Sequence, residues 1–411
     1  MTSDVLALPA PTRLIAVPGF ARLFVSGWLS HMTRWGGLFL GSLVVTQLTD
    51  SPVLNQLVGA CVFAPMLLGG LVAGALSDRV DRRRLVLATQ AASIPVAVAM
   101  AVVAQLGLVQ VWMVLVFTLA IGFGGVVNMT GLRPLMYEVA GPTFAARALA
   151  LDSAGVASAS MAGALAGGAL VDAVGTGAAF GLLALLLCAS TTLLRSVPST
   201  VVPPVPAAAA GPGPRFDEQL QASLGLLRRS PRLASVLGVT IVMNLFHFSF
   251  LPLVPVMAEQ FAASPLLAGV LGSAAGCGQL VGGMVLATRR STSHGHAYVG
   301  GSAIALGGLC LFATAPVLGL ACAALLLAGM GQAGFATMQS LLAIESATAA
   351  ERGAALGLLS TAIGALPLGM VGIGVVAELL GPRATMLASS LTGLALLALC
   401  VRRLPHLLMR V

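Results

Sequence analysis

The sequence predicts an all-α membrane protein in which twelve membrane-spanning helices form two pseudo-symmetric bundles of six. Three observations support this prediction: a very apolar composition, arginines that recur in alternate gaps between apolar segments, and a second half that repeats features of the first. Of the 411 residues, 58% are hydrophobic and only 8% are charged, and the mean hydropathy is +1.01. Soluble domains do not have such a composition, so the lipid bilayer is the expected environment.

The number of helices follows from segment length, because a spanning helix needs about 20 mostly apolar residues. Twelve segments meet this requirement. They lie near residues 20–47, 53–77, 85–106, 110–133, 144–171, 176–194, 233–259, 265–288, 297–314, 316–342, 353–378 and 383–401. The 49 glycines suit helices that pack closely in a membrane bundle.

The basic residues predict how these helices are oriented. All 21 are arginines, and nearly all fall in alternate gaps, which the positive-inside rule places in the cytoplasm. We therefore expect a multi-pass protein of the inner (plasma) membrane with both termini cytoplasmic. On this count Arg383 alone lies on the other side and Arg34 alone lies inside the membrane, while Arg133 and Arg147 lie around the loop between helices four and five.

The longest polar interruption divides the chain into two halves. We expect a first six-helix bundle over residues 1–195, a cytoplasmic linker over 196–232 and a second bundle over 233–411. The linker begins rich in proline and alanine, and residues 216–229 then have the pattern of an amphipathic helix on the inner membrane surface.

The two halves repeat when the first is shifted onto the second by 213 residues. Ser51-Pro52 then coincides with Ser264-Pro265, and Gly69-Gly70 with Gly282-Gly283. The same register matches Arg34 with His247 and His31 with Asn244. Two repeats around a central site are a plan that many secondary transporters use.

A charged stretch between the second and third segments carries the most specific motif. It reads Gly74-Ala-Leu-Ser-Asp78-Arg79-Val-Asp81-Arg82-Arg83-Arg84 and resembles the signature loop of the major facilitator superfamily of transporters. Gly74, Asp78, Arg79, Arg82 and Arg83 fill the family pattern, while Asp81 replaces its second glycine. The resemblance implies the major facilitator fold and transport by alternating access. Asp78 could cap the start of helix eleven and so latch the two halves together.

The chain as a whole resembles the enterobactin-exporter-like subgroup, also described as transmembrane secretion effectors. The resembling features are Phe20-Ala-Arg22-Leu, Thr49-Asp-Ser-Pro52, the signature loop and Arg229-Ser-Pro-Arg232-Leu. Helix five carries Gly163-Ala164-Leu-Ala-Gly167-Gly168, which is similar to the family's antiporter motif with Ala164 in place of its proline. These glycines would also serve close packing against helix eight.

Arg34 is the most informative single residue. It lies about 20 Å into helix one at 1.5 Å per residue, where a charge is costly and should face a cavity or a partner. It is therefore a candidate for binding substrate, with an ion pair inside the bundle as the alternative. Asp152 is the acid nearest to it by depth and the candidate partner.

His247 occupies the repeat-related position in helix seven and could carry a coupling proton, since histidine titrates near neutral pH. The alternative is a neutral histidine that is hydrogen-bonded inside the bundle. We expect His31, Arg34, Asn244 and His247 to face one another across the pseudo-twofold axis. Asn128 and Gln332 could add hydrogen bonds to substrate, or only between helices.

Charged residues also bracket the loops between helices four and five and between ten and eleven. They are Glu138, Arg147, Glu345 and Arg352. They could pair with the signature-loop arginines or with each other, in bonds made in one conformational state and broken in the other.

The sequence thus predicts a monomeric secondary transporter that exports a small organic solute, drug-like or siderophore-like, with a proton as coupling ion. The alternatives are a proton-coupled uptake symporter for an organic anion and a non-transporting membrane sensor or scaffold. We find no nucleophile–base pair, metal-ligand cluster or nucleotide-binding loop in the sequence, so an enzyme is not expected and no cofactor is assigned. A nucleic-acid partner is not expected either, because no soluble domain offers a basic surface.

Overall fold

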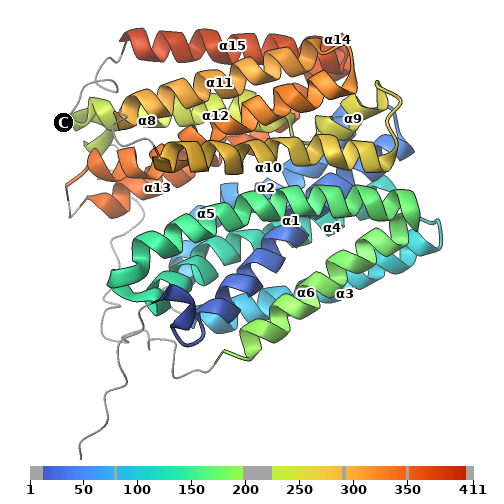
Figure 1. Ribbon diagram of the computed structural model, residues 1–411, viewed down its shortest axis with the longest axis horizontal. Coiled ribbons are helices and arrows are strands. Elements are labelled where there is room, and N and C mark those ends of the chain that lie inside the picture. The colour runs from blue at the N-terminus through green and yellow to red at the C-terminus, as the bar shows by residue number, and fades with distance from the viewer. Residues whose placement is uncertain (1–12, 78–80, 198–224, 289–292, 349–350, 404–411) are drawn as a thin grey trace, which may run out of the picture.

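The computed structural model describes residues 13–77, 81–197, 225–288, 293–348 and 351–403, with the side chains of 68–77 and of residue 146 excepted. This part of the chain is almost entirely helical. Its helices run side by side, with those of the first half below and those of the second half above in Figure 1. The prediction of an all-helical fold is confirmed. Asp78, Arg79 and most of the linker lie outside the described residues.

The first half consists of seven main helical elements. They are α1 (Phe20–Leu48), α2 (Pro52–Ser77), α3 (Arg82–Gln105), α4 (Val111–Val127), the π-helical η2 (Asn128–Leu132), α5 (Arg133–Ala173) and α6 (Thr176–Arg195). A 3₁₀ turn, η1 (Leu14–Ala16), precedes them.

The second half is more interrupted. Its elements are α8 (Pro231–Val242), the π-helical η5 (Met243–His247), the 3₁₀ turn η6 (Phe248–Phe250), α9 (Leu253–Glu259), α10 (Pro265–Thr288), α11 (His294–Thr314), α12 (Leu318–Glu345), α13 (Arg352–Ile363), α14 (Leu366–Leu380) and α15 (Pro382–Arg403).

The observed helices match the predicted spans closely. Within the described residues, ten helical segments are long and apolar enough to cross a membrane, and Pro52–Leu67 is a shorter apolar helix. The 29-residue α1, which carries Arg34 and several hydroxyl side chains, completes the set.

The fourth helix is the main departure from prediction. It continues as η2 and the start of α5 through Arg133, and the chain breaks only at Gly141, whose φ of 69° and ψ of 169° are not helical. The π-helical turn directly precedes Pro134, and such a wider turn relieves the clash between a proline ring and the preceding turn. Arg133 therefore lies within a spanning segment, and its predicted place in a loop is wrong.

Helices seven and eleven, predicted as continuous, are each broken. Helix seven passes from α8 through η5 and η6 to α9, and helix eleven breaks at Gly364-Ala365 between α13 and α14. Departures from α-helical geometry within a span mark places where the backbone can bend or where a site is formed.

Two helix pairs make the most extensive contacts between the halves: α2 with α14, and α5 with α10. In the second pair the backbones nearly touch, since a Cβ on Gly269 would lie 2.7 Å from the carbonyl oxygen of Ala164. The close packing of helix five against helix eight, predicted from the Gly163–Gly168 stretch, is therefore confirmed.

Candidate functional site

Arg34 is buried in the first half, with only 6% of its surface exposed. Its guanidinium carbon lies 4.8 Å from the ring centre of Phe63 and 5.9 Å from that of Trp35, and Nη2 lies 3.8 Å from the sulfur of Met66. Nε has no hydrogen-bond partner. No carboxylate lies within ion-pair distance of Arg34 among the residues that the structure describes. Aromatic faces stabilise a cation only modestly, so Arg34 retains an unmet capacity to bind an anion.

Gly125 of α4 makes room for this guanidinium. A Cβ at Gly125 would lie 2.8 Å from Nε of Arg34 and 2.9 Å from its Cζ. The arginine therefore rests directly on the backbone of α4, and its position depends on the absence of a side chain there.

Asp152 does not pair with Arg34, and the predicted partnership is wrong. Its carboxylate accepts a 2.5 Å hydrogen bond from Nε of Arg133, and Asp152 is 5% exposed. The reason is the length of helix four: it continues past Pro134 and carries Arg133 into the bundle, where the Arg133 side chain reaches Asp152. The ion pair that the sequence predicted inside the bundle exists, but Arg133 forms it.

His31 and Asn128 lie in the same half. His31 lies one turn before Arg34 on α1 and makes no hydrogen bond in the described part. Asn128 starts η2, is 6% exposed and donates a hydrogen bond to the hydroxyl of Ser30 on α1. Its Oδ1 has no partner. The first half thus gathers a polar cluster around Arg34, formed by α1, η2 and α5.

His247 is completely buried and ends the π-helical η5. It packs against the rings of Phe248 and Phe250, whose centres lie 4.9 and 5.6 Å away, and neither of its ring nitrogens is hydrogen-bonded. The amide of Gln332 approaches it and lies 3.5 Å from Gln279 of α10. The ring of His247 is thus enclosed by apolar side chains of the second half.

Asn244, expected to share a surface with His247, bonds to its own helix. It is 3% exposed, donates to the carbonyl of Thr240 and accepts from Ser249 through its main-chain oxygen. No hydrogen bond or ion pair joins the His31–Arg34 pair to the Asn244–His247 pair within the described ranges. Their convergence across the pseudo-twofold axis remains a prediction.

The hydrogen bonds between the halves lie at one end of the bundle, as far as the described side chains extend. We call this the opposite end, because it lies away from the arginine-rich end that carries Arg82, Arg83, Arg195, Arg229 and Arg232. Oε2 of Glu378, near the end of α14, accepts from Ser51 Oγ at 2.9 Å and from the Val53 amide at 3.3 Å. Gln56 donates to the carbonyl of Ser249 at 2.9 Å. Glu378 thereby caps the N-terminus of α2 from the other half through the Val53 amide.

At the arginine-rich end, Glu138 pairs with Arg82, so one of the two partnerships considered from the sequence is observed. Arg83 donates to the carbonyl of Arg195 at 2.9 Å. Asp81 caps its own helix, α3, by accepting from the amides of Arg83 and Arg84. These bonds all stay within the first half.

The matching acid of the second half behaves differently. Glu345 binds Arg232 at 3.0 Å and His294 at 2.8 Å, and among the described residues it does not pair with Arg352 or with a signature-loop arginine. The hydroxyl of Ser230 is bonded to the carbonyl of Ser346, which holds the start of α8 beside the end of α12 and brings Arg232 to Glu345.

Arg147 and Arg352 have no carboxylate partner among the described residues; Arg147 lies over the ring of Phe144, 5.9 Å from its centre. Glu351 binds Arg229 at 3.5 Å. Hydrogen bonds from the Thr348 hydroxyl and amide, and then the charge of Arg229, lower the pKa of Glu351. This exposed carboxylate is therefore ionised and can take part in a charged contact at this end.

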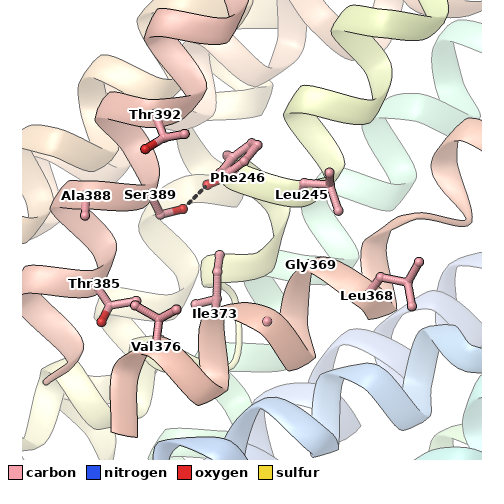
Figure 2. Close-up of a pocket in the computed structure, with 11 residues that line it drawn as sticks. Leu245, Phe246, Leu368, Gly369, Ile373, Val376, Thr385, Ala388, Ser389 and Thr392 are labelled. Atoms are coloured by element: carbon pink, nitrogen blue, oxygen red, sulfur yellow. Dashed lines mark hydrogen bonds between the residues drawn. The ribbon is translucent and has the colours of Figure 1, made fainter. Parts of the chain in front are cut away.

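One pocket of about 380 Å³ lies away from Arg34, between η5, α14 and α15 of the second half (Figure 2). Its rim includes Leu368, which is 63% exposed. Its position and its mostly aliphatic lining separate it from the polar cluster around Arg34.

Sequence reasoning missed Arg133, Phe63 and Gly125. The apolar run Leu-Met-Tyr-Glu-Val-Ala after Pro134, which ends at Gly141-Pro142, was a signal that helix four extends further. Phe63 and Gly125 could not be recognised, because only the tertiary packing brings α2 and α4 against Arg34.

Two repeats of six spanning helices, joined by α2 with α14 and by α5 with α10 and enclosing a buried cation, define a transporter of the major facilitator type. The family model described as transmembrane secretion effector matches residues 11–408. The chain belongs to this family.

Solved structures of similar fold extend over nearly the whole chain. A bacterial homologue of the human lysosomal transporter Spinster, described as inward-facing and unoccupied, has a TM-score of 0.70 and 14% identity, covering 95% of this chain and 97% of its own. The same homologue in an inward-facing, occupied form has a TM-score of 0.70 and 14% identity, with coverages of 94% and 97%. The nucleoside transporter NupG has a TM-score of 0.63 and 17% identity, with coverages of 93% and 99%. No curated protein matches the chain significantly.

Proposed function

We propose that this protein is a proton-coupled secondary transporter that exports a small amphiphilic organic molecule bearing a negative group, of drug-like or siderophore-like kind. The observation that carries the proposal is Arg34: a cation that is 6% exposed, rests on aromatic rings and has no acid partner in the described part of the chain. A buried cation of this kind is stabilised most strongly by an anion that binds to it. The aromatic and thioether side chains around Arg34 favour an anion that is attached to an apolar body.

Alternating access would move this site between the two membrane faces. The hydrogen bonds from Ser51, Val53 and Gln56 to the second half favour closure at the opposite end, and the positive-inside rule makes the arginine-rich end cytoplasmic. This state would be inward-facing, as the Spinster homologue structures are described. In the outward-facing state, Asp78 of the signature loop would cap the start of α13 in the same way.

Proton coupling is proposed at His247. The ring is fully buried with both nitrogens unpaired, and it lies where η5 departs from α-helical geometry. Opening of helix seven during the transport cycle would expose the ring to a proton from the outside. We place the protein as a monomer in the plasma membrane with both termini in the cytoplasm.

Reconstituted proteoliposomes with an imposed pH gradient test this function. The probes are a panel of amphiphilic carboxylates, each paired with its uncharged methyl ester. We expect the gradient to drive movement of carboxylates against their concentration difference, and a protonophore to abolish it. Gradient-driven movement of the esters alone, or movement in the same direction as the protons, would contradict anion export.

A further inference from the structure

We propose that the pocket between η5, α14 and α15 binds one acyl chain of a membrane glycerophospholipid, with Thr385 donating a hydrogen bond to the lipid's ester carbonyl. The pocket is unrelated to the Arg34 site and holds about 380 Å³. Figure 2 shows its walls: Ile373 and Val376 of α14 lie across from Thr385 and Ala388 of α15, Phe246 lies beside Ser389, and Leu245 and Leu368 lie together on the other side.

The bilayer is the environment that this pocket opens to. Leu368 at its rim is 63% exposed, and Val371 and Val375 beside it on α14 are 39% and 49% exposed. Apolar side chains this exposed on a spanning helix face hydrocarbon, where no water is present to fill a hollow. The expected occupant is therefore a lipid acyl chain, because it is apolar and is present in the bilayer that surrounds the pocket.

The dimensions of the pocket agree with one leaflet. The 22 residues of α15 extend about 33 Å at 1.5 Å per residue, close to the hydrocarbon thickness of about 30 Å. Thr385 lies roughly 5 Å from the start of this helix and Thr392 roughly 15 Å from it. The lining thus extends from the level where ester groups lie to about the bilayer centre, along the direction of an acyl chain.

Thr385 gives this pocket a hydroxyl group that needs a hydrogen-bond partner. Its side chain is 1% exposed and its hydroxyl has no hydrogen-bond partner. By contrast, the nearby hydroxyl of Ser389 is bonded to the carbonyl of Phe246 at 3.2 Å, as the dashed line in Figure 2 marks. An unpaired hydroxyl is costly in an apolar medium, and a carbonyl acceptor is what satisfies it.

Gly372 provides a way to close the pocket without disturbing the fold. It lines the pocket, and a Cβ built on it meets no atom within 4 Å. Gly372→Leu would therefore place a side chain where the acyl chain lies. Gly307→Leu is the matched control, because Gly307 on α11 also meets no atom within 4 Å and does not line the pocket.

The test uses nanodiscs of phosphatidylglycerol carrying a photoreactive diazirine in one acyl chain, followed by peptide mapping. In the wild type and Gly307→Leu we expect cross-links on residues 364–392 above those on other lipid-facing helices. In Gly372→Leu these cross-links should fall to the level of the other helices. Equal labelling of Gly372→Leu and the wild type would overturn the proposal.

A second variant tests the hydrogen bond independently of pocket shape. Thr385→Val keeps the volume and removes the hydroxyl, and loss of one hydrogen bond, about 1 kcal/mol, should weaken retention of a co-purified phospholipid about fivefold in native mass spectrometry. Retention equal to that of the wild type would show that Thr385 does not donate a hydrogen bond to the lipid.

Discussion

Glu378 and Ser51 come from different halves of the protein, and their side chains are joined by a 2.9 Å hydrogen bond at the opposite end. The same carboxylate oxygen accepts from the Val53 amide in the first turn of α2. An acid at the end of helix eleven thus caps the start of helix two. In the signature loop, Asp78 follows the end of helix two and is proposed to cap the start of helix eleven. The two caps would form one pseudo-symmetric pair of latches, each closed when the other is open.

Removing this cap should open the opposite end. Glu378→Gln loses the charge that the α2 N-terminus favours, a contribution of about 0.5–1 kcal/mol, and should shift the equilibrium about twofold to fivefold toward the outward-facing state. Spin labels can replace Leu106 and Val317, which are both exposed and lie in different halves. Double electron–electron resonance should then report a longer distance between the two labels. Glu259→Gln removes a charge from the same end and serves as control. Unchanged distance distributions in Glu378→Gln would argue against the latch.

The position of Arg34 should depend on Gly125. Gly125→Ala places a Cβ within 3 Å of the guanidinium and should displace it, weakening substrate binding about tenfold, or 1.4 kcal/mol. Gly124→Ala is the matched control, because its nearest neighbour would be Ser93 Oγ at 3.8 Å. Binding of a transported carboxylate can be measured by isothermal titration calorimetry on both variants. Equal affinities would mean that Arg34 does not hold the ligand.

The Arg133–Asp152 pair should stabilise the first half. Asp152→Asn leaves Arg133 without its counter-charge inside the bundle, which should lower the free energy of unfolding by about 3 kcal/mol. Replacing both residues by leucine should restore most of this loss, since a buried pair and a packed apolar pair are often equivalent. Thermal unfolding in detergent distinguishes these cases. If Asp152→Asn unfolds at the wild-type temperature, the pair does not have this role.

Hydropathy and arginine spacing were enough to predict the spans, because the bilayer imposes the length of each helix and the sidedness of its charges. The burial of Arg34 was predicted for the same reason. The partner of Asp152 was not, because the fourth span was predicted to end at residue 133, whereas the helix continues through the π-helical η2 and past Pro134. The breaks in helices seven and eleven also escaped prediction, since the average hydropathy of a segment does not record a local change of helical geometry. The surroundings of Arg34 depend on which helices meet, and Phe63 and Gly125 carry no local sign of that.

The charge of Arg34 is the centre of the proposed mechanism. A comparison of a charged substrate with its uncharged analogue tests this claim most directly. The measurement compares pH-gradient-driven transport of a carboxylate and its methyl ester by the wild type, Arg34→Gln and the control Arg383→Gln in proteoliposomes. We predict that Arg34→Gln loses transport of the carboxylate while transport of the ester is retained or increased, and that Arg383→Gln behaves as the wild type. Equal transport of the carboxylate by Arg34→Gln and the wild type would contradict the account.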